Sequence, residues 1–351
     1  MNRPLRVAAI GLGWVCLNRH LPAMARSRRF DVVGIVDRSP GRARAVAGKH
    51  RFRKHSQSSD LASVDWLDQV DAITIATAPM AHFALVREAI ALGKHVLTEK
   101  PFTMTAAEGD LLVAEAAAAD RRLAIVHNFQ FARSTRRLFD DMRNGVLGRV
   151  NSVDAVQFGN PARRLPTWCD ELPFGLFYDE SPHLLYLLRA IAGDLSLARS
   201  LAIPSRTGLN TPARVEAWFR GTGGDYPIRL ACNFESSVSE WYLMVAGEKA
   251  TGIVDIFRDI YIRLPNDGQH DTLRVLRTSR AATAQHWLQH LTSGVSHLTG
   301  RLDYGNDELF DRFARAAAGD TAAIAPIDGA AACAVLRLQH AIIDQAEAIY
   351  P

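Results

Sequence analysis

The sequence predicts an α/β protein that is divided into two domains. Its 351 residues are too many for one ordinary hydrophobic core. Strand and helix patterns alternate up to residue 127, and strand patterns follow one another more closely beyond it. We therefore expect one domain over residues 1–127 and a second over residues 128–351.

The first domain is expected to contain a parallel sheet. An apolar run at residues 5–10 ends in glycines and leads into a helical pattern at residues 15–27. A second apolar run, at residues 31–36, ends at Asp37 and precedes another helix. Further strands are predicted at residues 71–76, 95–98 and 123–126, and further helices at residues 80–92 and 105–119, the last with a capping box of Thr105 and Glu108. Such alternation is typical of a parallel sheet covered on both faces.

The second domain is expected to contain an antiparallel or mixed sheet. Strands are predicted at residues 150–158, 215–220, 228–235, 242–246 and 252–257. Helices are predicted at residues 133–144, 181–191, 307–318 and 329–349. The end of the chain is expected to pack partly against the first domain.

Composition argues against several classes of protein. Hydrophobic residues make up 48% of the chain and charged residues 22%, which is typical of a folded globular protein. No apolar run reaches the roughly 18 residues of a membrane span, and the N-terminus lacks a signal-peptide pattern, so we expect a cytoplasmic protein with no membrane partner. The basic cluster at residues 42–54 contains one aromatic residue and the net charge is only +4, so no nucleic-acid partner is expected. Scattered histidines and four widely spaced cysteines predict neither a metal site nor a disulfide framework: Cys16, Cys169, Cys232 and Cys333.

A dinucleotide-binding motif lies between the first strand and its helix. Gly11 permits a tight turn, and Gly13 lets a pyrophosphate approach the backbone amides at the helix N-terminus. Cys16, a small residue, replaces the third glycine. A glycine turn without a ligand would look the same, so the motif alone is weak. In this context it predicts a Rossmann domain over residues 1–127.

Asp37 strengthens the prediction of a bound dinucleotide. It follows Gly13 by 24 residues, at the end of the second strand, where a carboxylate can accept hydrogen bonds from a ribose diol. This position favours NAD slightly over NADP. Arg38, Ser39 and Arg42 could instead hold a 2′-phosphate, so NADP stays open.

Glu99 and Lys100 end the strand at residues 95–98, at the edge of the sheet where ligands bind in open α/β folds. Only five of the 41 basic residues are lysines, so a lysine here departs from the bias of the chain. Its ammonium group could bond a substrate hydroxyl and stabilise a developing alkoxide, and Glu99 could orient it or contact the nicotinamide ribose. A salt bridge at the end of the strand is the structural alternative.

Asp179 and His183 form a second candidate for proton transfer. Asp179 is predicted to cap a helix with Pro182 in its first turn, which places Asp179 and His183 on one helical face. An imidazole held by a carboxylate is a good proton shuttle near neutral pH. The loop before them supplies candidate substrate contacts: Arg163, Arg164, Trp168 and Tyr178.

Together these passages resemble the Gfo/Idh/MocA oxidoreductase family, named for glucose-fructose oxidoreductase and inositol dehydrogenase. The resemblance covers nearly the whole chain, and Gly-Lys-His-Val-Leu-Thr-Glu-Lys-Pro at residues 93–101 is its most specific part. It implies an open, mostly antiparallel sheet in the second domain, whose face commonly forms dimers or tetramers. Two departures are Glu180-Ser181-Pro182, where small residues are usual, and Gly175-Leu-Phe-Tyr178, a reduced glycine-rich approach.

The resemblance also implies roles for individual residues. Lys100 and His183 would flank the reacting hydroxyl, with His183 as general acid and base and Asp179 as its partner or a substrate ligand. The implied cofactor-binding residues are Gly11, Gly13, Trp14, Val15, Asp37, Arg38, Ala76, Thr77, His82, Glu99, Lys100 and Asn128. The implied substrate-binding residues are Lys100, Arg163, Trp168, Tyr178, Asp179 and His183.

The sequence therefore predicts an NAD(P)-dependent dehydrogenase or reductase acting on CH–OH groups of a small sugar, cyclitol or sugar nucleotide. We expect a homodimer or homotetramer. Two alternatives stay open: a redox-neutral glycosidase or lyase with tightly bound NAD, and a non-enzymatic regulator that senses a dinucleotide. Retention of Lys100, Asp179 and His183 argues against the regulator, because a sensor need not keep proton-transfer chemistry.

Overall fold

The computed structural model describes residues 3–163 and 165–348. It divides the chain into two compact units, Met1–Asn128 with Gly305–Arg337, and Phe129–Tyr304 with Leu338–Pro351. Residues 305–337 thus group with the first unit, although they follow the second domain in the sequence. Arg164 and residue 349 lie outside the described residues, and the helix predicted at residues 329–349 ends at Gln345, because Glu347–Ala348 form a strand instead.

The first unit is built on a six-stranded parallel sheet with the strand order β3-β2-β1-β4-β5-β6. The strands are β1 (Leu5–Ile10), β2 (Phe30–Asp37), β3 (Lys54–Gln57), β4 (Ala72–Ile75), β5 (His95–Thr98) and β6 (Leu123–Ile125). The order reverses between β1 and β4, which is the point where doubly wound sheets bind dinucleotides. The predicted Rossmann topology is confirmed.

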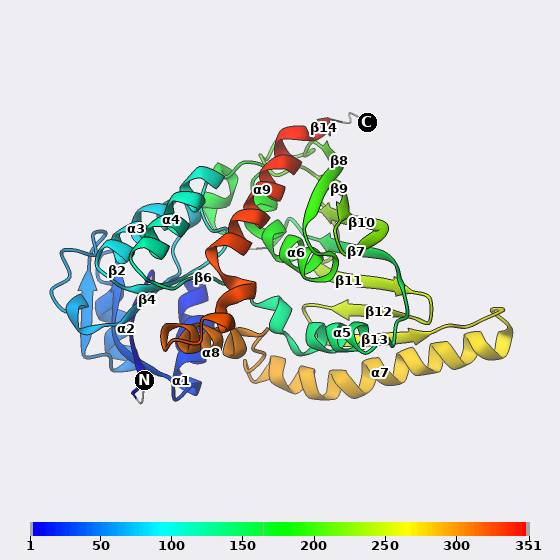
Figure 1. Cartoon of the computed structure of the whole chain (residues 1–351), viewed down its shortest axis with the longest axis horizontal. Coiled ribbons are helices and arrows are strands. Elements are labelled where there is room, and N and C mark those ends of the chain that lie inside the picture. Colours follow the sequence, from blue (N-terminus) through cyan, green and yellow to red (C-terminus); the bar gives the residue numbers. More distant parts are fainter. Residues whose placement is uncertain (1–2, 164, 349–351) are drawn as a thin grey trace. The chain divides into compact units, whose positions relative to one another are not determined.

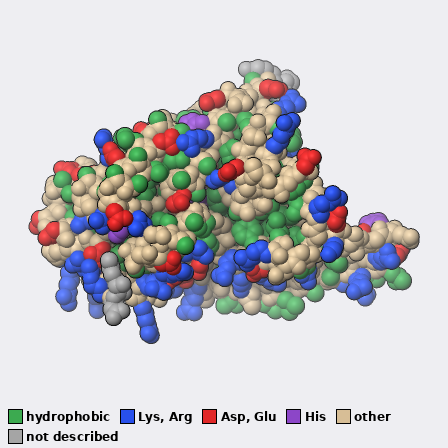
Figure 2. Space-filling view, in the orientation of Figure 1, with side chains coloured by type: hydrophobic (Ala, Val, Ile, Leu, Met, Phe, Trp, Pro, Cys, Tyr) green, Lys and Arg blue, Asp and Glu red, His purple; other side chains and the backbone are tan. Residues whose placement is uncertain are grey.

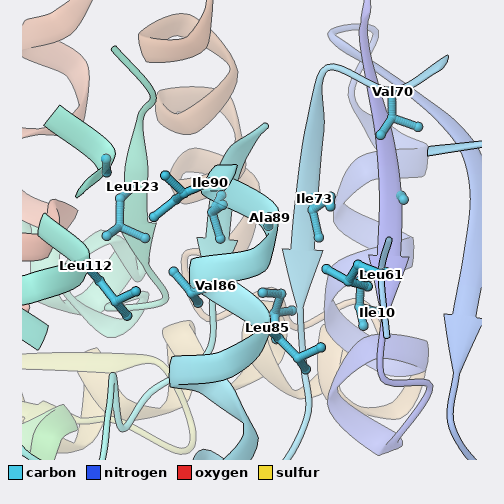
Figure 3. Packing of buried hydrophobic residues seen from close by; sticks show 14 of the residues in the cluster. Ile10, Leu61, Val70, Ile73, Leu85, Val86, Ala89, Ile90, Leu112 and Leu123 are labelled. Atoms are coloured by element: carbon cyan, nitrogen blue, oxygen red, sulfur yellow. The ribbon is translucent and has the colours of Figure 1, made fainter. Parts of the chain in front are cut away.

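Helices follow the strands of this unit. They are α1 (Leu21–Arg26), α2 (Arg42–His50), α3 (His82–Ala91), α4 (Ala106–Ala118) and α8 (Asn306–Ala317). The predicted capping box starts α4, where the Thr105 hydroxyl accepts from the Glu108 amide at 3.2 Å. Figure 1 shows α3 and α4 side by side. Figure 3 shows how α3 fills the core: its Val86 and Ile90 lie in the same buried cluster as Ile73 of β4 and Leu123 of β6.

The second unit contains an eight-stranded sheet with the order β13-β12-β11-β7-β10-β9-β8-β14. The strands are β7 (Val150–Phe158), β8 (Leu195–Ile203), β9 (Arg214–Gly221), β10 (Gly224–Asn233), β11 (Glu240–Gly247), β12 (Ala250–Asp255), β13 (Ile260–Pro265) and β14 (Glu347–Ala348). The β7–β10 and β8–β14 pairs are parallel and the others antiparallel. The predicted mostly antiparallel sheet is confirmed.

Three helices accompany this sheet within the unit. They are α5 (Arg133–Arg143), α6 (Leu176–Ala192) and α7 (Thr272–Leu298). The residues of α6 are largely buried, and α7 runs along the edge strand β13 (Figure 1). Helix α9 (Gly329–Gln345) gives its first residues to the first unit and its last to the second. Within the described residues, no helix combines the length and the hydropathy needed to cross a membrane.

Candidate active site

The glycine loop after β1 contains two glycines that differ in conformation and in the space around them. Gly11 adopts a φ of 82°, and a Cβ atom there would lie 2.6 Å from Thr77 Cγ2 and 2.9 Å from the Ala76 carbonyl oxygen. Only glycine fits such a position without strain. A Cβ on Gly13 would meet nothing closer than 3.9 Å, so the backbone at Gly13 is open to a close-lying ligand.

The helix after this loop begins irregularly. A π-helical turn, Cys16–His20, precedes α1. Cys16 is fully buried, and burial, assisted by the charges of Asp37 and Glu99, raises the pKa of its thiol to about 12. It therefore packs the helix against the sheet as a neutral group, as expected for a substitute of the third glycine. Trp14 is 64% exposed, with the Arg19 guanidinium 5.0 Å from its ring centroid.

Asp37 holds the glycine loop from the end of β2. Its Oδ2 accepts from the Leu12 amide at 2.7 Å, and its Oδ1 accepts from the Ser39 amide at 2.7 Å. Each carboxylate oxygen has two lone pairs, so capacity remains for ribose hydroxyls. Arg42 approaches Oδ2 to 3.8 Å, and Arg38 is exposed beside it. The side chains that could contact a ribose or a 2′-phosphate thus lie together.

His82 lies behind the turn that follows β4. Its ring is fully buried, with Nδ1 2.8 Å from the Pro101 carbonyl oxygen and Nε2 3.2 Å from that of Thr77. Burial, which outweighs these carbonyl contacts, lowers the pKa of His82. We expected His82 to contact the cofactor directly, but this placement gives it a positioning role, because its nitrogens face backbone carbonyls. It connects the turn to the segment after Lys100.

Glu99 is held on the other side of Lys100 by His20, a residue that the sequence did not single out. Glu99 Oε1 lies 2.9 Å from His20 Nε2, and Oε2 accepts from the Lys100 amide at 3.2 Å. The other nitrogen of His20 lies 2.7 Å from Thr74 Oγ1. Burial alone would raise the pKa of Glu99, but the hydrogen bond and charge of His20 and the charge of Lys100 outweigh it and lower this pKa. Glu99 is therefore an anion that fixes the backbone of Lys100.

Replacing His20 with leucine is expected to lower the free energy of unfolding by roughly 3 kcal/mol at about pH 7.5, because Glu99 would stay buried without its partner. In the native protein the lowered pKa of Glu99 stabilises the fold above its ordinary value of 4.5, and this contribution is lost as pH falls through the native pKa. In the variant, burial would raise the pKa, so stability should increase when pH falls from about 7.5 to about 5.

Urea titrations at the two pH values measure this difference. The double variant His20→Leu, Glu99→Gln is the control, since it has no carboxylate to titrate and should lose the pH dependence. Equal stability of His20→Leu and the native protein at both pH values would contradict the role given to His20.

In the second unit, α6 begins earlier than expected. We expected Asp179 to be the N-cap, but the helix begins at Leu176 after Gly175, so Asp179 lies in its first turn and Pro182 in its interior. The proline leaves the Tyr178 carbonyl without its helical donor. Gln339 Nε2 donates to this carbonyl at 2.6 Å and replaces the missing bond. The i, i+4 spacing still places Asp179 and His183 on one face of α6.

His183 is surrounded by aromatic side chains of its own unit. The Phe129 ring lies tilted over it at 4.4 Å between centroids, and the Trp241 ring lies at 5.6 Å. His183 Nδ1 is 2.9 Å from Tyr186 Oη, which also accepts from the Phe129 amide at 2.9 Å. A hydroxyl can donate to or accept from Nδ1, so Tyr186 suits either tautomer. His183 is therefore oriented by a partner that was not predicted, and half-buried Asp179 lies one turn before it.

The three described loop candidates have different environments. Arg163 donates to Glu180 at 2.7 Å, and Gln157 donates to the other oxygen of Glu180. Glu180, a departure from the family pattern, thus attaches the loop to α6. Trp168 is half-buried and stays a candidate for substrate contact.

Tyr178 is fully buried, with its hydroxyl 3.3 Å from His340 Nε2. A side chain without exposed surface cannot contact a substrate in this arrangement. We therefore replace the substrate-contact hypothesis for Tyr178 with a packing role.

Metal-binding and thiol side chains form no second cluster in the described part of the chain. Among the residues that the structure describes, no group of three or more His, Cys, Asp or Glu side chains is arranged to hold a metal ion. The four cysteines are free thiols and all are buried. In the described residues, neither metal ligands nor reactive thiols therefore form a catalytic site besides the one that contains Lys100.

Comparison with known proteins identifies the family of the N-terminal domain. The model of the oxidoreductase family with an NAD-binding Rossmann fold, named for Gfo, Idh and MocA, matches residues 5–127. The N-terminal domain belongs to the Gfo/Idh/MocA family. The resemblance inferred from the sequence is thereby confirmed for the N-terminal domain.

Curated relatives and solved structures similar to this chain include sugar-nucleotide enzymes. The dTDP-3,4-didehydro-2,6-dideoxy-alpha-D-glucose 3-reductase of Saccharopolyspora spinosa is 29% identical over 163 residues, 46% of this chain and 47% of the relative. The chain therefore aligns with about half the length of this relative.

Two solved structures align with nearly the whole chain. The WlbA dehydrogenase from Bordetella pertussis, in complex with NADH and UDP-GlcNAcA, has a TM-score of 0.77 at 20% identity, over 99% of this chain and 96% of that one. A mutant of KijD10, a 3-ketoreductase from Actinomadura kijaniata in complex with TDP-benzene and NADP, has a TM-score of 0.72 at 17% identity, over 99% of both chains. These likenesses concern the fold alone, and they cover both units of the chain.

The residues of this Gfo/Idh/MocA domain fit a dinucleotide. The open backbone at Gly13 and the carboxylate of Asp37 lie at the point where the strand order reverses. The hydroxyls of Thr77 and Thr98 are buried without a hydrogen-bond partner in the described part of the chain. Buried hydroxyls in native proteins are usually paired, so these two are available to a polar ligand.

Proposed function

We propose that this protein is an NAD(P)-dependent oxidoreductase that transfers a hydride between nicotinamide and a hydroxyl or carbonyl carbon of a sugar, cyclitol or sugar nucleotide. The observation that carries the proposal is the position of Lys100. It follows β5 at the carboxyl edge of the sheet, with Glu99 and its partner His20 fixing its backbone on one side and His82 bonded to Pro101 on the other. A lysine whose backbone is fixed at this edge on both sides suits the stabilisation of a developing alkoxide.

The proposed roles divide the proton and the charge between two side chains. Lys100 Nζ donates a hydrogen bond to the reacting oxygen and stabilises its negative charge. His183 Nε2 takes the hydroxyl proton during oxidation and returns it during reduction, because Nδ1 is engaged by Tyr186. The nicotinamide, when bound, accepts or supplies the hydride. Asp179, on the same face of α6, is proposed to bind the substrate or to support His183.

Within this proposal, NAD is favoured over NADP. The carboxylate of Asp37 would repel a 2′-phosphate but accept bonds from the ribose diol. The names of the relatives support both cofactors, since WlbA was solved with NADH and the KijD10 mutant with NADP. The preference therefore depends on Asp37 and on the neighbouring Arg38 and Arg42.

Replacing Asp37 with asparagine is expected to weaken NADH binding about tenfold or more, because a charge-assisted hydrogen bond contributes roughly 1.5–3 kcal/mol. NADPH binding should change less, since the loss of the negative charge favours a 2′-phosphate. Fluorescence titration of both cofactors gives the two dissociation constants. A native protein that binds NADPH more tightly than NADH would overturn the preference. Arg42→Gln, which removes a cation that lies 3.8 Å from the Asp37 carboxylate, is the matched control.

The substrate class rests on the names of the relatives and on an aromatic side chain in the loop before α6. The Saccharopolyspora relative is named a reductase of a dTDP-sugar, and WlbA was solved with a UDP-sugar. Trp168, an aromatic residue in the loop before α6, is the side chain of this chain that we propose to contact the substrate. The proposed assembly is a homodimer or homotetramer.

The test is an absorbance screen of the purified protein with both cofactors against polyols, aldoses and sugar nucleotides. Nicotinamide reduction with at least one class supports the proposal. Tightly retained NAD with turnover but no net absorbance change would identify the redox-neutral alternative. Cofactor binding without turnover of any class would favour the regulator.

A further inference from the structure

Helix α7 packs against its domain with a polar face. Gln285 and Gln289, one turn apart, each bond both backbone groups of a residue in the edge strand β13. Gln285 pairs with the Arg263 amide and carbonyl at 3.0 and 2.9 Å. Gln289 pairs with those of Tyr261 at 2.9 and 2.6 Å. Ser293, the next residue on this face, is buried. The side chains that attach α7 to β13 are therefore the amides of Gln285 and Gln289, whereas the Ser293 hydroxyl donates to the Gln289 carbonyl within α7.

The opposite face of α7 is apolar and exposed. At 100° per residue the positions of these residues fall on one side of the helix, in a group at 273 and 276 and a longer group from 287 to 298. They are Leu273, Leu276, Trp287, Leu288, Leu291, Val295 and Leu298, and their exposed fractions run from 45% to 90%. We call this set the α7 stripe. An ordinary surface helix has the opposite arrangement, with its apolar side on the core. The exposed apolar surface is contiguous from Trp287 to Leu298, and a surface of this kind is typical of a binding site.

The charges of α7 are all of one sign. Residues 272–298 contain Arg274, Arg277 and Arg280 but no aspartate or glutamate. Arg274 pairs with the N-cap Asp271 at 3.2 Å. Arg277 and Arg280 are exposed and form no ion pair with another described residue, and Arg280 lies two turns from both Leu273 and Trp287. Free guanidinium groups thus accompany the α7 stripe, and Figure 2 shows hydrophobic and basic side chains along this edge of the unit.

The charge pattern decides between two partners. In a second copy of the chain, α7 would bring its own arginines to a helix that has no carboxylate to receive them. An anionic lipid surface provides both an apolar boundary and phosphate groups. The 27 residues of α7 would extend about 40 Å along such a surface at 1.5 Å per residue. We propose that α7 is an interfacial helix that docks the protein on anionic membranes, with the α7 stripe in the lipid and its arginines at the phosphates.

This docking differs from a membrane span. The sequence argued against a membrane partner because it lacks a long apolar run, and this argument concerns helices that cross the bilayer. An interfacial helix needs only one apolar face, so the lack of a long apolar run does not argue against it. The proposal does not depend on the enzymatic activity, which α7 variants should retain.

The experiment is flotation of the full-length protein with vesicles of phosphatidylcholine alone or of phosphatidylcholine mixed with phosphatidylglycerol. Binding is expected only with phosphatidylglycerol, and added salt should weaken it. Arg277→Gln with Arg280→Gln is expected to weaken binding roughly 30-fold, at about 1 kcal/mol for each basic residue near an anionic surface. Leu288→Glu with Leu291→Glu should abolish it. Leu209→Glu, in an exposed loop residue, is the control and should bind normally.

Tryptophan fluorescence gives a second readout. The emission should shift to shorter wavelength on binding, and the shift should be lost in Trp287→Phe while flotation persists, because the other five of six tryptophans lie outside α7. Absence of binding to anionic vesicles, or equal binding by the glutamate variant, would overturn the proposal. So would a change of oligomeric state in the glutamate variant without a change in vesicle binding, which would identify the α7 stripe as a contact between copies.

Discussion

Replacing Lys100 with alanine is expected to lower kcat about 10³-fold, because removal of one preorganised donor to a developing oxyanion costs roughly 10²- to 10³-fold and the lost positive charge adds to it. The dissociation constant of NADH should change less than about threefold, since the loss concerns a group that acts in the transition state. Steady-state kinetics and fluorescence titration measure the two effects separately.

Lys94 provides the matched control for this variant. It lies just before β5, at the opposite end of the strand from Lys100, and its ammonium group donates to the Val70 carbonyl at 2.9 Å. Lys94→Ala should therefore cost some stability but leave kcat nearly unchanged. A Lys100→Ala protein with native turnover would refute the role of this residue.

Replacing His183 with alanine is expected to lower kcat roughly 10²- to 10⁴-fold, the usual contribution of a general acid or base. The space between the rings of Phe129 and Trp241 has held an imidazole, so added free imidazole should restore part of the activity. Rescue of His183→Ala but not of Lys100→Ala would separate proton transfer from charge stabilisation.

Tyr186→Phe tests how His183 is oriented. This variant keeps the ring but removes the hydroxyl that lies 2.9 Å from Nδ1. We expect a kcat about tenfold lower with little change in KM, since loss of one hydrogen bond costs about 1 kcal/mol or slightly more.

For the His183→Ala variant, native activity or a failure to respond to added imidazole would contradict the proposed proton transfer.

The sequence predicted the parallel sheet well because its signals are local. The strand at residues 5–10 and the capping box of Thr105 and Glu108 depend on neighbouring residues alone, and both are present as predicted. The start of α6 was predicted wrongly for the opposite reason. Asp179 and Pro182 resemble the first residues of a helix, but Gln339, distant in the sequence, lets the helix continue through the proline.

Helix α7 was missed because its pattern is inverted. Its apolar residues face outward, and its contact with β13 uses Gln285 and Gln289. A search for helices that cover a core with an apolar face does not find such a segment.

The sequence analysis predicted neither His20 as the partner of Glu99 nor Tyr186 as the partner of His183, for different reasons. His20 is 79 residues from Glu99, so no local pattern connects them. Tyr186 is three residues after His183, on the same helical face, and this spacing could have indicated it.

The central claim is that Lys100 and His183 act on one substrate oxygen. A crystal structure of the protein with NAD and a substrate identified by the absorbance screen tests it most directly. The claim predicts that Lys100 Nζ and His183 Nε2 both lie within about 3.2 Å of the hydroxyl oxygen on the reacting carbon. A substrate bound with its reacting oxygen beyond the reach of either atom would contradict it.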